Sequence, residues 1–329
     1  MSVIAPISVP GSSFPVSPML TGIAIGYRNP DAYYIAEALS PKLPPMGDQA
    51  FEYTLFDPAA AITNTDAQVG PQSEPNQIEV GGTAVIAKTV DYGYDSPIPT
   101  SEQTAYERMV AMGLAVADPA AYRVQTLVNR LDLSREVRVA AMYQNPNNYN
   151  AARVVDLAAG GQTKISVYAS SDPIGLVQKA MDSTLIYRPN VMWLPRPVWT
   201  IFRSHPKIMK AINRTAGDSG SATAEQVAAL FDLKKVLIGD AFINGANPGQ
   251  TLAPGRVWGN AFGLAYVNPT AVMGQDATFS FTYQFLGRLA GQMAEPKKGL
   301  RGTTLVRVGE SLKEVVAAPD VACLFQNPI

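Results

Sequence analysis

The sequence contains very few of the residues that build metal, redox or nucleophilic sites. Its 329 residues include one histidine, His205, and one cysteine, Cys323. A single cysteine excludes an internal disulfide, so packing or association must stabilise the fold, and a reducing compartment is the expected setting. One histidine and one cysteine cannot form a Cys/His zinc site, and the carboxylates lack the spacing of a calcium-binding loop. We therefore expect no metal and no cofactor.

An excess of charge of one sign and long apolar runs are also absent. Lys+Arg 26 against Asp+Glu 27 leave a net charge of -1, which is not typical of a protein that binds nucleic acid through a basic surface. No apolar run approaches the roughly 20 residues that span a bilayer, so we expect no membrane partner. The N-terminus lacks a basic region followed by an apolar stretch, and we expect neither a secretory signal nor a removed propeptide.

Proline, by contrast, is frequent in the first 45 residues, which show little sustained apolar periodicity. A segment that buries too little apolar surface cannot offset the conformational entropy lost when it becomes ordered. We therefore expect the rest of the chain, or further copies of it, to hold this arm. On this interpretation, a subunit without residues 1–40 should fold but assemble poorly.

Two strand-like runs follow the arm. Residues 51–56 alternate large apolar with polar side chains and end at Asp57-Pro58, and a second run covers about 78–92. The polar stretch between them, 59–77, is too long for a tight turn. The pattern predicts a projecting hairpin. Because an isolated hairpin is only marginally stable, it needs a neighbouring surface.

A long helix is predicted from Asp118 to Tyr143. Asp118 can cap the free backbone amides, Pro119 suits the first helical position, and Asn145-Pro146 ends the run. We expect surface ion pairs of little energetic value around Arg130 with Asp132 and around Glu136 with Arg135 and Arg138, and a DNA-facing role for these arginines is less favoured. The expected buried stripe comprises Val124, Leu127, Val128, Leu131, Ser134, Val137 and Ala141.

Helix and strand patterns alternate through the middle of the chain, and strands dominate after it. This succession indicates an α+β fold with helices packed on a sheet. Trp193, Trp199 and Trp258 are expected in the core. Helices are predicted at 173–187, 197–204, shortly after Pro206 and at 223–231, and strands at 191–194, 235–238, 263–267, 278–286, 303–308 and 312–317.

One catalytic candidate pairs Ser219 with His205. Gly217-Asp218-Ser219-Gly220 resembles the nucleophile turn of chymotrypsin-like serine proteases, but His205 lacks the flanking residues of that family, and this loop sequence is common. A histidine that caps or packs at the helix end before Pro206 is favoured over a general base. Gly160-Gly161-Gln162-Thr163-Lys164 has the wrong spacing for a phosphate-binding loop. We predict no catalytic residue and no enzymatic activity, with a serine hydrolase as the alternative from another class.

Several short motifs resemble one family when they are taken in order. Arg135-Glu136-Val137-Arg138-Val139-Ala140-Ala141, followed by Asn150, resembles the end of the spine helix in major capsid proteins of tailed bacteriophages with the Hong Kong 97-type fold. The likeness extends from about Pro30 to Gln284. The further motifs are Arg188-Pro189-Asn190, Val198-Trp199, His205-Pro206-Lys207-Ile208, Ala224-Glu225-Gln226 with Leu230-Phe231, Val236 to Ala241, Trp258-Gly259 and Leu264 to Val267.

This resemblance implies four parts and a structural function. The parts are an N-terminal arm at 1–50, an extended loop at 51–95, a peripheral domain with the spine helix at 96–149 and 276–329, and an axial domain at 150–275. The implied function is self-assembly as hexamers and pentamers into an icosahedral shell around a double-stranded DNA genome. The implied location is the virion, after assembly in the bacterial cytoplasm.

Two features of the family are not expected in this chain. Some members carry a cleaved N-terminal scaffolding segment, whereas here we expect any scaffold, like cement and portal proteins, to be a separate chain. Others join a loop lysine to a neighbour's asparagine, but 59–77 contains no lysine and Lys88 lies well down the second strand. We predict a shell without covalent crosslinks and with weak, non-specific DNA contacts. The alternative within this fold is an encapsulin-like compartment, for which the proline-rich arm is a poor match.

Overall fold

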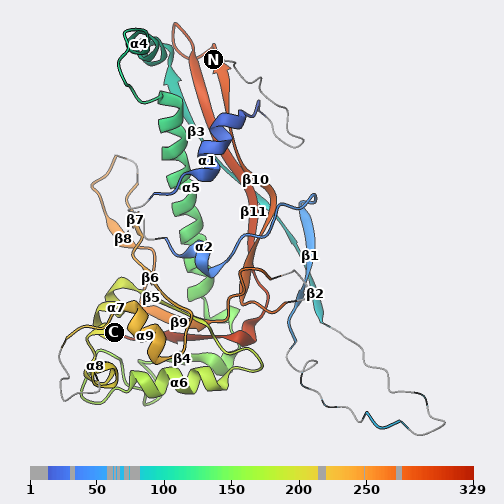
Figure 1. Cartoon of the computed structure of the whole chain (residues 1–329), viewed down its shortest axis with the longest axis vertical. Coiled ribbons are helices and arrows are strands. Elements are labelled where there is room, and N and C mark those ends of the chain that lie inside the picture. Colours follow the sequence, from blue (N-terminus) through green and yellow to red (C-terminus); the bar gives the residue numbers. More distant parts are fainter. Residues whose placement is uncertain are drawn as a thin grey trace.

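The computed structural model describes residues 14–29, 34–57, 62, 64, 67–69, 74, 82–213, 220–247, 249–271 and 276–329. Figure 1 shows an elongated upper part built along a long helix, a wider lower part with a second sheet, and a hairpin that leaves the side of the molecule. The chain ends in the lower part, whereas the N-terminal helix lies on the upper part. The molecule therefore has two sheets, one along the long helix and one below it.

The long helix is α5, Pro119–Gln144, and its start is the predicted one. The Asp118 side chain accepts a hydrogen bond from the Ala120 amide at 3.0 Å. Helix α4, Thr100–Ala111, precedes α5, and the short 3-10 turn Pro146–Asn148 follows it. The capping and helix-stop signals in the sequence thus set both ends of the helix.

The upper sheet packs along α5. It consists of β10 (Ser280–Glu295), β11 (Thr303–Val316) and β3 (Val90–Pro99), antiparallel in the order β10-β11-β3. Apolar side chains of the helix and the sheet pack together in one buried cluster, and their burial stabilises this part. They include Val124, Leu127, Val128 and Leu131 from α5, with Ile98, Ala290, Val306 and Val308 from the sheet.

Strand β11 differs from its prediction, because one strand replaces the two expected at 303–308 and 312–317. The segment between the two predicted strands includes the polar Glu310, which is paired with buried cations within the sheet. Gly309 lies opposite Gly93 on β3, where an added Cβ would meet the Tyr92 carbonyl oxygen at 3.2 Å. Close backbone contact and charge pairing therefore keep the strand continuous.

The lower sheet has five strands in the order β4-β12-β9-β5-β6. Trp193 and Trp258 are buried and pack with ring centroids 5.2 Å apart, and Trp199 is also buried, as predicted. The strands are β4 (Val154–Asp156), β12 (Ala322–Gln326), β9 (Ala261–Ala265), β5 (Val191–Pro195) and β6 (Lys235–Gly239). The remaining elements are α6 (Pro173–Ser183), α7 (Arg196–Arg203), α8 (Pro206–Asn213), α9 (Ala224–Leu230), the hairpin of β7 (Phe242–Asn244) and β8 (Pro254–Arg256), and 3-10 turns at Ala151–Arg153 and Pro319–Val321.

Strand β12 lies in a different place from the one that the expected domain division gives it. The division assigns 276–329 to the peripheral domain, whereas β12 pairs in parallel with β4 and antiparallel with β9 in the lower sheet. Its residues Ala322, Cys323, Leu324 and Phe325 are all buried there. The end of the chain thus returns to the lower part and completes its sheet.

The described part of the arm packs on the rest of its own chain, which is the first of the two expected ways of holding it. Helix α1, Pro18–Gly26, lies on the upper sheet and α5, and α2, Ala36–Leu39, lies further down α5 (Figure 1). Leu20, Ala24 and Leu39 are inaccessible or nearly so. Leu20, Ile23, Ala24 and Tyr27 recur at helical spacing and pack in a core with α5 and the upper sheet.

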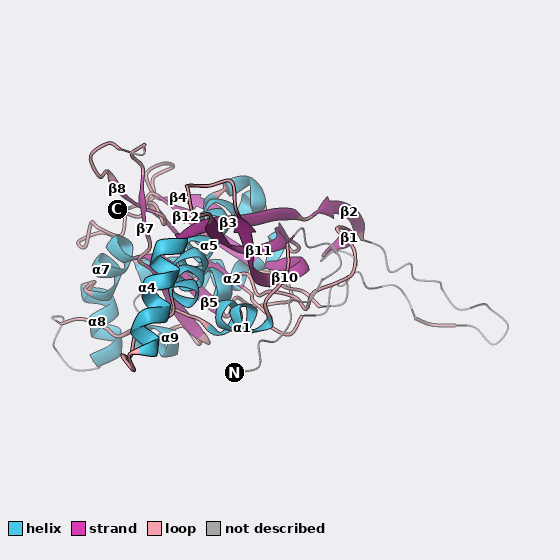
Figure 2. Cartoon of the chain, turned by 90° about the horizontal axis from the view of Figure 1, so that it is seen from above, coloured by secondary structure: helices cyan, strands magenta, loops and turns pink. Residues whose placement is uncertain are grey.

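The projecting hairpin consists of β1, Ala50–Leu55, and β2, Thr83–Lys88, paired from Ala50 with Lys88 to Leu55 with Thr83. Figure 2 shows these two strands extending away from the helices. The second predicted strand, 78–92, proves to be β2 and the start of β3, separated at Thr89. Residues 78–81 and most of the predicted loop 59–77 lie outside the described residues.

The buried face of α5 follows the prediction only in its first half. Beyond Leu131 the buried side chains are Arg135, Glu136, Val139, Ala140 and Tyr143, while Ala141 is exposed. The expectation of surface ion pairs at Arg135 and Glu136 is therefore wrong. These polar groups are buried because the arm and the lower part of the molecule supply matched partners for them.

Candidate assembly surfaces

Glu136 joins the arm, the long helix and the lower part of the molecule. Its carboxylate accepts hydrogen bonds from the amides of Ile35 and Ala36 at 3.0 and 2.8 Å and from the Trp258 indole at 2.7 Å. Burial raises the pKa of Glu136, and these three donors together with Arg135 oppose that rise. The carboxylate therefore fixes α2 against α5 and ties both to the loop before β9.

Arg135, next along the helix, holds the following part of the arm. Its guanidinium pairs with Glu37 and donates to the Ser40 carbonyl oxygen at 2.6 Å and to the Thr282 hydroxyl at 3.1 Å. Because these partners lie on α2, just after it and on β10, one side chain connects the arm to the upper sheet. A guanidinium suits this position since its donors lie in a fixed plane.

A second buried charge cluster lies higher on the same sheet. Glu310 on β11 is paired with Lys42 of the arm at 3.1 Å and with Arg288 of β10 at 3.2 Å. Arg288 also contacts Asp132 of α5 at 2.6 Å. Burial acts to raise the pKa of Glu310, but Lys42 and Arg288 more than offset it and leave the pKa below its ordinary value.

The arm also pairs with the backbone of β10 in two places. Near its start, Ser17 N–H donates to the Ala290 carbonyl oxygen at 3.0 Å, and the Thr21 hydroxyl both accepts from Ala290 N–H and donates to the same oxygen, each at 3.1 Å. Further along, Leu43 N–H donates to the Thr282 carbonyl oxygen at 2.9 Å. The arm thus acts as an interrupted extra strand along β10.

The base of the hairpin is fixed by aromatic packing. Phe51 of β1 stacks on Tyr283 of β10 with centroids 3.8 Å apart and planes 7° from parallel. The Tyr283 hydroxyl donates to the Asp48 carbonyl oxygen at 3.1 Å. Beyond this base the hairpin leaves the body, and Ile86 on β2 is 77% exposed. Ile86 pairs with Glu52, next to Phe51, so the hairpin exposes an apolar side chain close to its anchored base.

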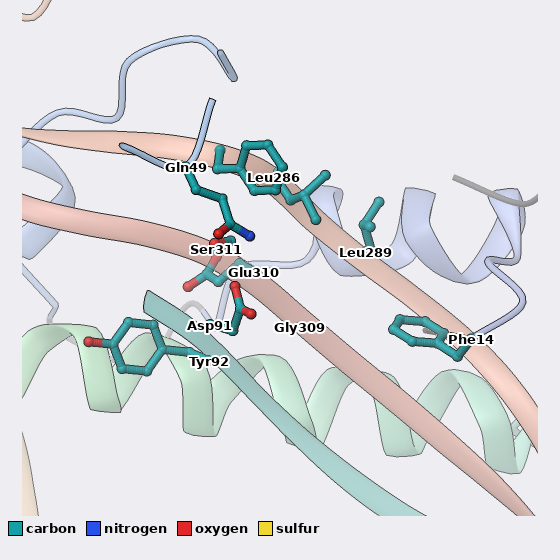
Figure 3. A pocket seen from close by; sticks show the side chains of 11 residues that line it. Phe14, Gln49, Asp91, Tyr92, Leu286, Leu289, Gly309, Glu310 and Ser311 are labelled. Carbon is teal, nitrogen blue, oxygen red and sulfur yellow. The ribbon is translucent and has the colours of Figure 1, made fainter. Parts of the chain in front are cut away.

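A pocket of about 150 Å³ lies on the upper sheet between the two places where the arm pairs with β10. Figure 3 shows Gln49, Ser311 and Asp91 gathered at one end and Leu289 and Phe14 toward the other. No histidine, cysteine, lysine or arginine lines this pocket. Its two carboxylates are Asp91 and Glu310, and Glu310 is already paired with Lys42 and Arg288.

His205 is the packed, capping histidine that the sequence favours. It is fully buried, its Nδ1 accepts from the Lys207 amide at 3.2 Å, and its Nε2 lies 2.9 Å from the Ser171 hydroxyl. Because Nδ1 is an acceptor, the ring proton is on Nε2 and is donated to Ser171, which is the wrong tautomer to activate that serine. Burial, together with Lys207, lowers the pKa of His205.

The other catalytic candidate, Ser219, lies outside the described residues. Cys323 is buried within β12, and burial raises the pKa of its thiol to about 11, so it remains protonated. Within the described ranges, no group of three or more His, Cys, Asp or Glu side chains could hold a metal ion. In the same part of the chain, no helix is both long and apolar enough to cross a membrane.

Comparison with solved structures defines the class of fold. The structure matches a phage-related protein from Bordetella bronchiseptica with a TM-score of 0.73 at 20% identity, covering 96% of this chain and 99% of that one. It also matches a chain in the capsid structure of cyanophage P-SCSP1u, with a TM-score of 0.54 at 13% identity and coverage of 91% and 90%. The mixed α+β fold is thus shared with phage capsid structures.

Sequence comparison shows the family. The chain is 35% identical over 316 residues to the major capsid protein of Pseudomonas phage JBD67, covering 96% of this chain and 98% of that relative. No protein-family model matches the chain. The chain belongs to the phage major capsid proteins. The resemblance noted from the motifs is confirmed.

The features that shape this capsid subunit are only partly predicted from the sequence. The projecting hairpin and the arm were predicted, whereas the Glu136 and Glu310 clusters were not. A signal was present in the arm, where Glu37 and Lys42 are acidic and basic residues within an otherwise weakly charged stretch. Their partners lie 98 and 268 residues away along the chain, and local patterning does not reveal such pairs.

Proposed function

We propose that this capsid protein builds an icosahedral shell of the Hong Kong 97 type, from hexamers and pentamers of identical chains. The observation that carries the proposal is the anchored hairpin. Within the described part of the chain, β1 and β2 pair only with each other, and a two-stranded hairpin is marginally stable without a surface to lie on. A neighbouring copy supplies that surface in a closed assembly.

The proposed layout keeps the expected division with one change. Residues 1–50 form the arm, 51–95 the extended loop, 96–149 with the strands from 276 the peripheral domain, and 150–275 the axial domain. The pairing of β12 with β4 and β9 supports assigning 322–326 to the axial sheet. The two parts of the peripheral domain are joined where Ser96 to Pro99 of β3 pair with Thr303 to Val306 of β11, and the rest of β3 continues this pairing from the range of the extended loop.

The arm has a different role from the one expected. Its described residues fill the core of their own subunit and are fixed there by Glu136 and Glu310. We propose that this attachment holds the base of the hairpin in a defined direction, because Leu43 and Phe51 pack in the same cluster as Tyr283. The hairpin, rather than the described arm, then reaches the neighbouring subunit.

The shell is proposed to be held by packing and hydrogen bonds, without a covalent crosslink, since 59–77 contains no lysine. It encloses double-stranded DNA with weak, non-specific contacts, in keeping with a net charge of -1. Further partners in the proposal are scaffold, cement and portal proteins. Assembly takes place in the bacterial cytoplasm, and the protein ends in the virion.

The proposed role is structural and not enzymatic. The tautomer of His205 argues against the serine hydrolase alternative, because its Nε2 proton is directed at Ser171. The relative that aligns with 96% of this chain at 35% identity is a phage protein, and this origin favours a genome container over the encapsulin-like alternative. Both observations favour a container subunit, whose functional site is its assembly surface.

Electron microscopy of the purified full-length chain, together with its mass from light scattering, tests this function. Closed particles or six- and five-fold rings are expected. A strictly monomeric mass at all concentrations, also with the scaffold and portal proteins of the same phage present, would refute it. A particle without hexamers would refute the proposed architecture while leaving the family assignment intact.

A further inference from the structure

A continuous apolar stretch lies on the surface at the upper end of the molecule. Residues 109–117, Met-Val-Ala-Met-Gly-Leu-Ala-Val-Ala, form the end of α4 and its connection to α5, and all nine are exposed. Met112 is 68% exposed. A run of more than three or four exposed apolar residues is costly in water and marks a contact surface in a folded protein.

Helix α4 itself gains little from its own subunit, since none of its residues is buried. It is held near its start, where the Thr100 hydroxyl donates to the carbonyl oxygens of Arg301 and Gly302 at 3.0 and 2.7 Å and Glu102 pairs with Arg123 of α5 at 3.2 Å. A twelve-residue helix without a buried face is marginal in water. This helix therefore needs a second surface, in addition to its attachment at Thr100.

The turn between β10 and β11 lies at the same end of the molecule (Figure 1). Its apex residue, Leu300, is fully exposed, and Lys297, Lys298 and Arg301 around it are exposed cations. On α4, the two exposed residues just before the apolar run are the acid Glu107 and the base Arg108. One end of the subunit thus carries an exposed leucine with basic neighbours and an apolar strip beside an exposed acid.

We propose that the β10–β11 turn of one copy docks on the 109–117 strip of a second copy, with Leu300 on the apolar run and Lys298 toward Glu107. The occupant is a second copy because both halves of the contact, complementary in charge and in apolar character, occur on this chain. Since the two halves differ, the contact is heterologous and links copies head to tail around an axis. The inference rests on the proposed function, in which copies of the chain assemble.

Substitutions at exposed positions test the contact without disturbing the fold. Leu300→Asp and Met112→Asp should leave the subunit's thermal unfolding unchanged and raise the concentration needed for particle formation about tenfold or more, the factor expected for loss of one buried apolar side chain. Ile86→Asp on β2 is a comparison variant, because Ile86 lies on the hairpin and outside the proposed contact. If Leu300→Asp and Met112→Asp both form particles at the same protein concentration as the wild type, the contact is refuted.

A charge exchange identifies the partner surface. Lys298→Glu should weaken assembly, Glu107→Lys should do the same, and the double variant E107K/K298E should recover it, because the pair is restored with reversed sign. Failure of the double variant to recover would refute the pairing of these two surfaces. Failure of the wild-type chain to assemble would refute the proposed function. If the wild type assembles and the Leu300→Asp and Met112→Asp variants assemble equally well, only this contact is refuted.

Discussion

The Trp258 indole and the Glu136 carboxylate are joined by a 2.7 Å hydrogen bond between residues 122 positions apart. Both side chains are buried, and the same carboxylate holds the amides of Ile35 and Ala36. The contact therefore lies where the arm, the long helix and the lower sheet meet. A substitution of Glu136 should therefore destabilise the packing of the arm, the long helix and the lower sheet on one another.

Glu136→Gln should lower the free energy of unfolding by about 1 to 3 kcal/mol, since the amide NH2 group of glutamine would face N–H donors and leave at least one buried donor unpaired. Denaturant unfolding followed by tryptophan fluorescence measures the change. Glu52→Gln on exposed β1 is the matched control and should shift stability by no more than about 0.5 kcal/mol. Equal effects of the two substitutions would contradict the proposed bridging role.

Thr21→Val should destabilise the subunit by about 1 to 3 kcal/mol, because the valine leaves the buried Ala290 amide without its acceptor, whereas the Ala290 carbonyl oxygen keeps the Ser17 N–H. Thr21→Ser keeps the hydroxyl and should stay closer to wild type. Hydrogen exchange at the Ala290 amide gives a local readout, with faster exchange expected only in the valine variant. Protection of that amide in Thr21→Val would count against this role.

Glu310→Gln should cost about 3 to 5 kcal/mol near neutral pH, because Lys42 and Arg288 would lose a buried counter-charge. The pKa of Glu310 lies below its ordinary value of 4.5. Its stabilising effect is therefore complete above pH 4.5 and is lost as the pH falls through the lower pKa of the folded state. The stability difference between wild type and variant should narrow below pH 4.5.

Denaturant unfolding of both proteins across this acid range measures the narrowing. A difference that stays constant down to the acid limit of folding would show that Glu310 does not titrate with the expected depressed pKa. Asp57→Asn, at an exposed position after β1, provides a control for loss of one carboxylate elsewhere.

Deletion of residues 1–40 should prevent the subunit from folding, in contrast to the expectation from sequence. The deletion removes Leu20, Ala24 and Leu39 from two cores and takes the amide partners from Glu136. Circular dichroism, limited proteolysis and solubility provide the measurements. A soluble deletion variant with a cooperative thermal transition near that of wild type would contradict the burial argument.

The elements best predicted from the sequence are those set by local signals. Asp118-Pro119 marks the start of α5, and Thr223 with Gln226 forms the capping box that begins α9. The apolar run at 191–195 is β5, buried at every position. In each case the information lies within a few residues of the element, so that no knowledge of the rest of the chain is needed.

The elements that could not be predicted depend on distant partners. Arg135 and Glu136 have the same local pattern as a solvated helix face, and their burial follows from Ile35, Ala36 and Trp258. Glu310 lies between the two strands predicted at 303–308 and 312–317, and its counter-charges Lys42 and Arg288 allow it to be buried within one continuous strand. Charge neutralisation across the fold, rather than local propensity, decides both positions.

The backbone pairing of the arm with β10 has a consequence before any shell exists. An edge strand presents unpaired backbone N–H and C=O groups to which a strand of another chain can bond, and this leads to aggregation. Ser17, Thr21 and Leu43 occupy such groups at Ala290 and Thr282 within the same subunit. A protein that accumulates in many copies is therefore protected from non-specific edge-to-edge strand pairing until its assembly contacts form.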